Sequence, residues 1–285
     1  MSKLKKLLGY LRNNPEDTTA NIAQKFDTSK RHVRRARAQL RKEAERPKIL
    51  LLDIETMPMM SLTWGLYKQY INHEAIVKDW SVGCWCAKWL GSNEIIGRTN
   101  TGEQCKDRED SEIIADMHAL MDDADIIIAH NGDGFDLPKL NTRFLKNGLS
   151  PTSPYQTIDT LKVCRKHFSF ANNKLDNVAR ELGLPRKANN EYDWWYDAAV
   201  HGSDDGINKI YKYCHQDIWT LEEVYYALRP WIKSHPNIGL YSEGNCSVCP
   251  NCGSDDLIWG NYYYTMVGKY SACLLYTSPS PRDRG

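Results

Sequence analysis

The acidic residues that follow apolar runs are the side chains of this sequence best suited to catalysis or metal binding. Asp53 and Glu55 come directly after Ile49–Leu52, a run typical of a buried strand. Residues two apart on a strand point to the same face, so the two carboxylates should lie side by side and repel each other. A divalent cation would remove that cost, and oxygen ligands favour Mg²⁺ or Mn²⁺. A strand end whose acids simply face water is the alternative interpretation of this pair.

A third acid, Asp136, follows a second apolar run within ADIIIAHNGDGFD. Gly132 and Gly134 permit a tight backbone path between that run and the acid. Phe135 is placed to wedge against the sheet or a base, while Asp136 begins a helix. Asp133 precedes that helix and is more typical of a turn acid.

A fourth acid, Asp217, belongs to the helical pattern YKYCHQDIWTL. Tyr213 lies four residues earlier and therefore shares its helical face. A tyrosine hydroxyl beside a metal-bound carboxylate can orient an attacking water, although a packing role for Tyr213 is the simpler alternative. His215 and Tyr211 are predicted to lie on other faces.

The elements that must position these residues alternate between strand and helix patterns. Strands are predicted at 49–52, 75–77, 80–88 and within 124–131, and a short strand leads into a helix within 155–168. Helices are predicted at 110–121, after Phe135, and at 207–228. This order predicts an α/β domain with a mixed sheet and helices packed on it.

The charge of the chain is distributed unevenly. Its 285 residues carry a net charge of +1, but residues 1–48 hold 14 Lys and Arg against 5 Asp and Glu. A basic segment ahead of an acidic body suggests an anionic partner, with nucleic acid the first choice. A solvated basic helix is the alternative.

The basic segment, residues 1–46, has the pattern of a small all-α domain with three helices. TTANIAQKFDTSKRHVRRA resembles a helix-turn-helix, in which the third helix would enter a major groove or lie along phosphates. A small helical docking domain is the other interpretation. The predicted nucleic-acid-binding side chains are Lys30, Arg31, Arg34, Arg35 and Arg37.

The nine cysteines fall into two groups. The five between Cys84 and Cys214 are scattered, which is typical of reduced, buried thiols. In residues 245–272, CPNCG resembles the first knuckle of a zinc ribbon, with Cys249 and Cys252 as ligands. Cys246 is an additional candidate by position, and the ribbon is partial because a second Cys pair is missing.

The last segment, residues 273–285, reads CLLYTSPSPRDRG and resembles the in-frame translation of a sequencing adapter. We therefore expect Cys273 to be non-native and the natural chain to continue into the missing Cys pair. Zn²⁺ would then belong to the complete ribbon of the full-length protein.

Taken together, D-x-E, N-x-x-x-F-D and Y-x-x-x-D occur in an order that resembles the DEDD superfamily of 3′→5′ exonucleases. The tyrosine four residues before Asp217 is typical of the DEDDy branch, whereas the histidine branch would need His at Lys212. KDWSVGCWCAKWLG, YQTIDTLKVCRKHF and NNKLDNVARELGL also resemble phage-type proteins related to the proofreading domain of family-B DNA polymerases. The resemblance covers roughly 48–231 and implies the ribonuclease H-like fold.

The resemblance implies roles for individual residues. Asp53 would bridge two Mg²⁺ or Mn²⁺ ions, and Glu55, Asp136 and Asp217 would complete their ligand shells. Tyr213 would position the water that attacks, and the product would be a nucleoside 5′-monophosphate. The implied substrate contacts are Asn131, Phe135 and Asp159, and Trp64 is a further candidate for stacking on terminal bases.

The sequence therefore predicts three parts: a helix-turn-helix in 1–46, an exonuclease domain in 48–235 and a partial zinc ribbon in 245–272. The expected partner is nucleic acid, DNA favoured, with a single-stranded 3′ end. Because the chain has no polymerase domain, proofreading would need a polymerase in trans. A structure-specific endonuclease or a ribonuclease on the same fold stays open. So does a DNA-binding regulator with an inactive nuclease fold, although the intact acidic quartet argues against it.

The remaining composition indicates the cellular setting. With 41% hydrophobic and 26% charged residues, the balance is that of an ordinary globular protein. The longest apolar run is far below the roughly 20 residues of a membrane span, and the N-terminus lacks the apolar core of a signal peptide. We expect no membrane association and a cytoplasmic location in a bacterial or phage-infected cell.

Overall fold

The computed structural model describes residues 3–14, 17–33, 36, 47–184, 191–241, 249–251, 257–265 and 268–275. The chain divides into two compact units. One is Lys48–Pro236, and the other comprises Met1–Pro47 and Asn237–Gly285. All the candidate acids and Tyr213 lie in the central unit, Lys48–Pro236.

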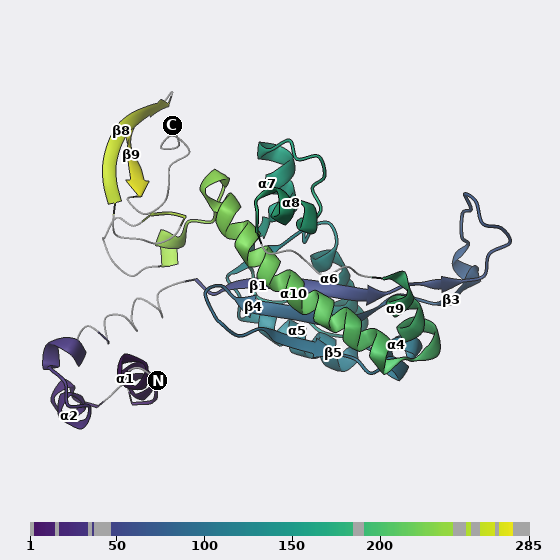
Figure 1. The fold of residues 1–285 in the computed structure, drawn as a ribbon, viewed down its shortest axis with the longest axis horizontal. Coiled ribbons are helices and arrows are strands. Elements are labelled where there is room, and N and C mark those ends of the chain that lie inside the picture. The colour runs from purple at the N-terminus through teal and green to yellow at the C-terminus, as the bar shows by residue number, and fades with distance from the viewer. Residues whose placement is uncertain are drawn as a thin grey trace. The chain divides into compact units, whose positions relative to one another are not determined.

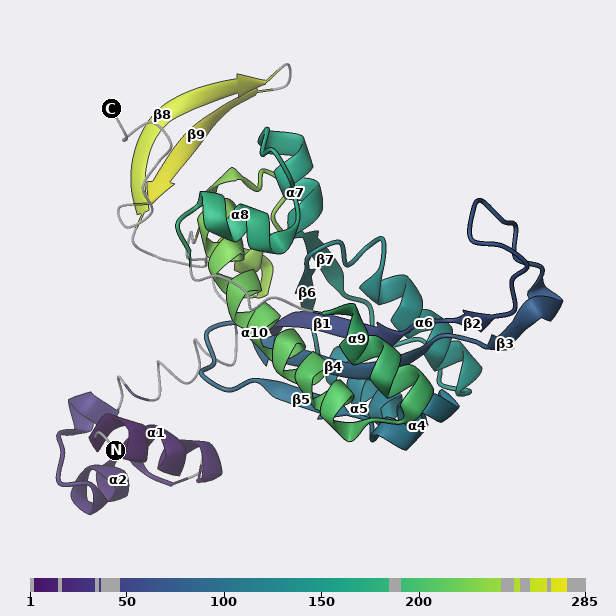
Figure 2. The same ribbon diagram turned by 45° about the vertical axis from the view of Figure 1, so that its right-hand side comes forward.

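A five-stranded mixed sheet forms the middle of the central unit, in the order β5-β4-β1-β6-β7 (Figures 1 and 2). β1 runs antiparallel to β4 and parallel to β6, while β5 is antiparallel to β4 and β7 is parallel to β6. The predicted mixed sheet is confirmed. The strands are β1 (Ile49–Met57), β4 (Ser81–Trp89), β5 (Ile96–Thr99), β6 (Ile126–Ala129) and β7 (Gln156–Asp159).

Alternate residues of β1 enter the cores on the two faces of the sheet. Leu50, Leu52 and Ile54 pack with α5 (Ser111–Asp122) and α6 (Asp136–Lys146). Met57 packs on the opposite face, where α10 (Asp204–Leu228) covers β1 and β4. The shorter helices that contact α10 are α4 (Gly102–Asp107), α7 (Thr160–His167), α8 (Leu175–Glu181), α9 (Tyr192–Tyr196) and the π-helical turn Asp197–His201. A 3₁₀ turn, Arg229–Trp231, follows α10.

An arm extends from the end of β1 (Figures 1 and 2). Its base is the short antiparallel pair β2 (Met60–Ser61) and β3 (Ile76–Lys78). Between the two strands runs a loop that ends in the 3₁₀ turn His73–Ala75. The backbone N–H of Leu62 donates to the carbonyl of Ala75 and closes this loop at 2.9 Å.

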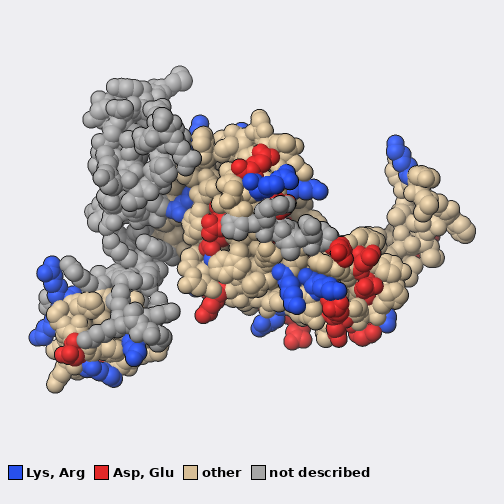
Figure 3. Space-filling model, viewed as in Figure 1, with Lys and Arg blue, Asp and Glu red and all other residues tan. Residues whose placement is uncertain are grey.

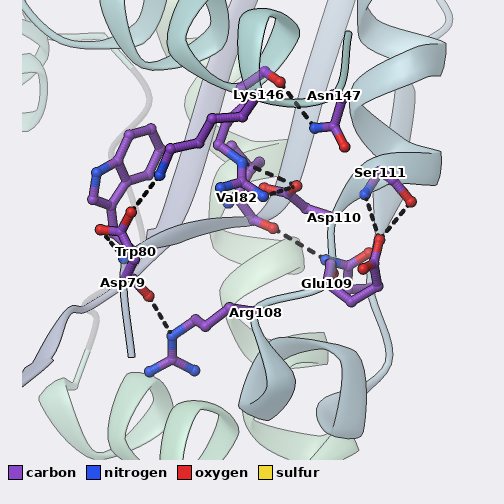
Figure 4. A network of polar contacts seen from close by, with 11 residues as sticks. Asp79, Trp80, Val82, Arg108, Glu109, Asp110, Ser111, Lys146 and Asn147 are labelled. Carbon is purple, nitrogen blue, oxygen red and sulfur yellow. Dashed lines mark hydrogen bonds and ion pairs between the residues drawn. The ribbon is translucent and has the colours of Figure 1, made fainter. Parts of the chain in front are cut away.

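A buried carboxylate, Asp110, ties α6 to the sheet (Figure 4). Its Oδ2 accepts from the N–H of Val82 at 2.8 Å, and its Oδ1 accepts from Arg143 Nε at 3.0 Å. Because Val82 belongs to β4 and Arg143 to α6, this one side chain fixes the helix that begins at Asp136. The sequence pattern did not predict this contact, since its members are far apart in the chain.

An ion pair between Lys88 and Glu222 fastens α10 to β4. Both side chains are buried, at 1% and 6% exposure, and the pair is in direct contact. The ammonium of Lys88 also lies 4.2 Å from the ring centroid of Trp219, and Glu222 Oε1 accepts from the N–H of Gly91 at 3.2 Å. The pair thus holds the helix that carries Asp217.

The flanking segments contain two helices and a hairpin. α1 (Lys3–Asn13) and α2 (Thr19–Lys25) share a core that includes Val33 and Ala36. Thr18 caps α2 by accepting from the N–H of Asn21. Most of the predicted third helix lies outside the described residues. After the 3₁₀ turn Ile238–Tyr241, β8 (Leu257–Thr265) and β9 (Gly268–Leu275) form an antiparallel pair.

None of the helices in the described ranges is long and apolar enough to cross a lipid bilayer.

We predict that Lys88→Met lowers the free energy of unfolding by about 3–5 kcal/mol, because it leaves the Glu222 carboxylate buried without its cation. Urea unfolding of the whole chain measures this change. Lys209→Met is the matched control, since Lys209 pairs with Asp205 at the surface, and surface pairs contribute about 0–1 kcal/mol. A loss no larger than that of the control would contradict the structural role of the buried pair.

Candidate metal centre

Strand β1 presents Asp53 and Glu55 on the face covered by α10. In the register with β4, Asp53 lies opposite Cys86 and Glu55 opposite Cys84. The register then shifts between Glu55 and Thr56, which marks a bulge. Bulges re-aim side chains and are common beside active sites. The two acids are therefore adjacent on one face, as their spacing predicted.

Helix α10 brings the third acid to the same place. Asp217 is buried, and one turn earlier the thiol of Cys214 donates to the carbonyl oxygen of Asp53 at 3.5 Å. One carboxylate oxygen from each of Asp53, Glu55 and Asp217 lies within 4.8 Å of the others. Residues separated by more than 160 positions in the chain thus meet in one cluster, which we call the acid cluster.

The donor chemistry of the acid cluster fits a hard divalent cation. All three donors are carboxylate oxygens, the ligands that Mg²⁺, Mn²⁺ and Ca²⁺ prefer over thiolates or imidazoles. Three negative charges at this separation repel strongly, and a divalent ion bound between them offsets that repulsion. Asp53, Glu55 and Asp217 are the residues that would hold it.

Asp136 lies beside the acid cluster through the backbone of β1. Its Oδ1 accepts from the N–H of Ile54, the residue between the two β1 acids, at 3.1 Å. Burial raises the pKa of Asp136 to about 7, the hydrogen bond from Ile54 opposes the rise, and the charge of Asp159 adds to it. Asp136 is thus next to the cluster but is not one of the three grouped carboxylates.

Tyr213 lies on α10, one turn before Asp217, and packs against an aromatic neighbour. Its ring meets Trp195 edge to face, with centroids 6.1 Å apart at 81°. Trp195 in turn stacks on Trp194 at 6.4 Å. The sequence did not single out this pair of tryptophans, because their contact depends on how α9 crosses α10. Their packing limits the positions available to the Tyr213 ring.

Asp159 organises the turn that precedes Asp136. Its Oδ1 accepts from the N–H of Leu161 at 3.0 Å, which caps α7, and from the N–H of Asn131 at 2.9 Å. Asn131 has a left-handed backbone with φ of 69°, which asparagine tolerates better than most residues. Asp159 therefore stabilises the strained turn, a structural role visible only once β6 and β7 are paired.

A pocket of 260 Å³ opens beside this turn. Its lining includes Asp133, Asp159, Lys162, Lys166 and His167. Asp133, predicted as a turn acid, pairs with Lys162 at 2.7 Å. The second oxygen of Asp159 is buried and accepts no hydrogen bond from the described residues. Phe135 is partly exposed, and the ammonium of Lys139 lies 5.1 Å from its ring centroid.

A layer of thiols lies beneath the acid cluster. Cys84, Cys86 and Cys214 are buried, and so are Cys105 and Cys164, which confirms the expected buried thiols. Burial raises the pKa of Cys214 well above its ordinary value, and contacts with Cys84 and Cys86 add to this. Burial raises the pKa of Cys105 to about 12. Cys214 and Cys105 therefore stay protonated and are poor metal ligands at neutral pH.

The candidate residues outside the central unit are only partly described. Lys30 and Arg31 are exposed, while Arg34, Arg35 and Arg37 lie outside the described residues. Cys249 is buried, and its predicted zinc partner Cys252 also lies outside them.

Comparison with known protein families identifies the superfamily of the chain. Residues 87–229, half of the chain, match the family described as the RNase H superfamily. The chain belongs to the RNase H superfamily, which has a nuclease fold whose members use divalent metals and bind nucleic acid. The matched region includes Asp136, Tyr213 and Asp217, but it begins after Asp53 and Glu55.

Other comparisons add less. No curated protein matches the sequence. A solved family B DNA polymerase from the hyperthermophilic archaeon Pyrobaculum calidifontis is similar at 16% identity with a TM-score of 0.49. That similarity covers 65% of this chain and 25% of the polymerase, so the chain spans about a quarter of the length of that protein.

We predict that Asp217→Asn abolishes stabilisation by Mn²⁺. A ligand at 100 times its Kd adds about 2.7 kcal/mol to the free energy of unfolding, and removing one of three charged donors should leave little of this. Thermal unfolding in EDTA and in excess Mn²⁺ measures the difference. Asp205→Asn, an exposed acid on the same helix, is the control and should respond like the wild type. An undiminished Mn²⁺ response in Asp217→Asn would rule out the acid cluster as the metal site.

Proposed function

We propose that this protein is a metal-dependent 3′→5′ exonuclease that hydrolyses phosphodiester bonds at nucleic-acid 3′ ends, with DNA preferred. The observation that carries the proposal is the acid cluster of Asp53, Glu55 and Asp217, with Asp136 bonded to the backbone between the first two. Tyr213 precedes Asp217 by one helical turn. The order and spacing of these residues resemble those of the DEDDy exonucleases, which supports the proposal.

In this proposal, the four acids would hold two Mg²⁺ or Mn²⁺ ions. When bound, such ions would supply a hydroxide nucleophile near neutral pH and offset the charge on the leaving 3′-oxygen. Asp53 and Glu55 would bind the ions from β1, and Asp217 would bind them from α10. Asp136 lies beside them because its Oδ1 accepts from the N–H of Ile54. The Tyr213 hydroxyl orients the attacking water, with the ring held against Trp195.

The substrate contacts in the proposal surround the turn before Asp136. Phe135 offers a partly exposed ring for stacking on a terminal base. Asn131 holds the turn through its backbone bond to Asp159. The pocket of 260 Å³ lined by Asp159 and Lys162 is a further proposed contact for the strand.

The flanking segments are proposed to select the substrate. Lys30, Arg31, Arg34, Arg35 and Arg37 would bind phosphates as part of a helix-turn-helix in 1–46. Cys249 and Cys252 would belong to a zinc ribbon begun in 245–272. A polymerase acting in trans and a cytoplasmic setting complete the proposal.

We predict that the wild type shortens 5′-labelled linear single strands stepwise with Mg²⁺ and leaves circular single strands intact. Asp53→Asn should lower the rate more than about 100-fold. Losing an outer-shell partner of a metal ligand already costs up to about 100-fold, and Asp53 is itself a proposed ligand. Gel analysis of the labelled strands measures both results. Asp205→Asn is again the control. Cleavage of circles would indicate an endonuclease, and full activity of Asp53→Asn would exclude this catalytic site.

We predict that Tyr213→Phe lowers kcat by about 10- to 100-fold, because it removes the hydroxyl that orients water while keeping the ring against Trp195. Mn²⁺ stabilisation and the thermal midpoint should stay at their wild-type values. Single-turnover digestion of a labelled strand measures the rate. If kcat is unchanged, Tyr213 is a packing residue.

A further inference from the structure

The arm carries an unusual concentration of exposed apolar side chains. Trp64, Tyr67 and Tyr70 are 103%, 88% and 106% exposed, so their rings project into solvent. Of the 17 large apolar side chains exposed among the described residues, eight lie between Met59 and Val77. Single exposed apolar residues are normal, but a contiguous group marks a binding surface.

The backbone of the arm holds these rings on a defined loop. The Leu62–Ala75 bond closes its base, the N–H of Trp64 donates to Gln69 Oε1 at 3.3 Å, and Asn72 caps the 3₁₀ turn. The loop has no strand of its own over most of its length. Loops of this length in compact domains are usually functional.

The spacing and charge of the arm favour a polyanion with flat rings. The aromatic residues recur at every third position, Trp64, Tyr67 and Tyr70, and Lys68 lies among them. Between Glu55 and Glu74 the sequence has no acid. In Figure 3 the arm is mostly tan, with blue at its tip. Aromatic rings beside a basic residue form the usual platform for single-stranded bases.

The arm is also continuous with the metal centre. β1 carries Asp53 and Glu55 and ends at Met57, and the arm begins at Met60, three residues later. The arm is therefore the direct continuation of β1, the element that would bind the end of a nucleic-acid strand at the acid cluster.

We propose that the arm binds single-stranded nucleic acid by stacking its bases on Trp64, Tyr67 and Tyr70. The bound strand is the one whose 3′ end occupies the metal centre, so the assignment of the strand rests on the proposed function. The stacking itself needs neither the metal nor cleavage. The two ideas can therefore fail separately.

The first test measures binding without catalysis. The full chain in EDTA binds a labelled oligothymidylate of about 20 nucleotides, at about 0.3 M salt so that phosphate contacts of basic segments are weakened. We expect a Kd at least about tenfold higher for the Trp64→Ala/Tyr67→Ala/Tyr70→Ala variant than for the wild type. Replacing the same three residues by Phe should keep most of the affinity. Tyr226→Ala, a partly exposed tyrosine on α10, is the control and should bind normally.

A second test locates the contact. Oligonucleotides containing 5-iodouracil, irradiated on the wild type, should crosslink to the tryptic peptides 49–68 and 69–78, which contain the three aromatic residues. Crosslinks found only elsewhere would overturn the proposal.

A small substrate distinguishes the function of the arm from that of the metal centre. Thymidine 5′-(p-nitrophenyl) phosphate reaches the acid cluster without spanning the arm, so a Tyr67→Ala/Tyr70→Ala variant should hydrolyse it at the wild-type rate. Equal loss of this activity, or unchanged oligonucleotide affinity, would overturn the role of the arm. A change in sedimentation without a change in affinity would overturn it too, and would make the arm a contact between copies of the chain. If the wild type cleaves neither substrate, the nuclease proposal fails while the binding test still decides the arm.

Discussion

Three carboxylates crowded within 4.8 Å set the central physical problem of this structure. Two unit charges 4 Å apart cost about 1 kcal/mol in bulk water and about 4 kcal/mol near a protein surface. The repulsion acts between β1 and α10, because Asp53 and Glu55 lie on one and Asp217 on the other. The thiol of Cys214 on the Asp53 carbonyl joins α10 to β1 against this repulsion, and the buried Lys88–Glu222 pair fastens α10 to the neighbouring strand β4.

The fourth acid reaches this site by a chain of backbone contacts. Asp159 caps α7 and holds the N–H of Asn131, which fixes the left-handed turn ahead of α6. The turn delivers Asp136 to the N–H of Ile54, between the two acids of β1. The bonds of Asp159 to Asn131 and of Asp136 to Ile54 join residues 28 and 82 positions apart. The position of Asp136 therefore depends on the pairing of β7 with β6 rather than on any contact between the acids.

Local patterns in the sequence were sufficient to predict which acids lie on one face and that the sheet is mixed. The D-x-E spacing after an apolar run placed two carboxylates on one face, and helical spacing placed Tyr213 with Asp217. Contacts between distant segments were not predictable, because nothing near Lys88 specifies Glu222 and nothing near Tyr213 specifies Trp195. The strand β5 and the helices α4, α8 and α9 were missed as well, since short elements take their form from tertiary packing more than from local pattern.

The thiols under the acid cluster can report how often the contact between the sheet and α10 opens. Cys84 and Cys86 on β4 and Cys214 on α10 face each other across the contact between sheet and helix. Buried thiols do not react with a reagent in solution until the interface opens. The rate at which an alkylating reagent modifies these three cysteines therefore reports how often α10 lifts from the sheet. A bound cation, by joining the carboxylates of the two elements, should slow that modification.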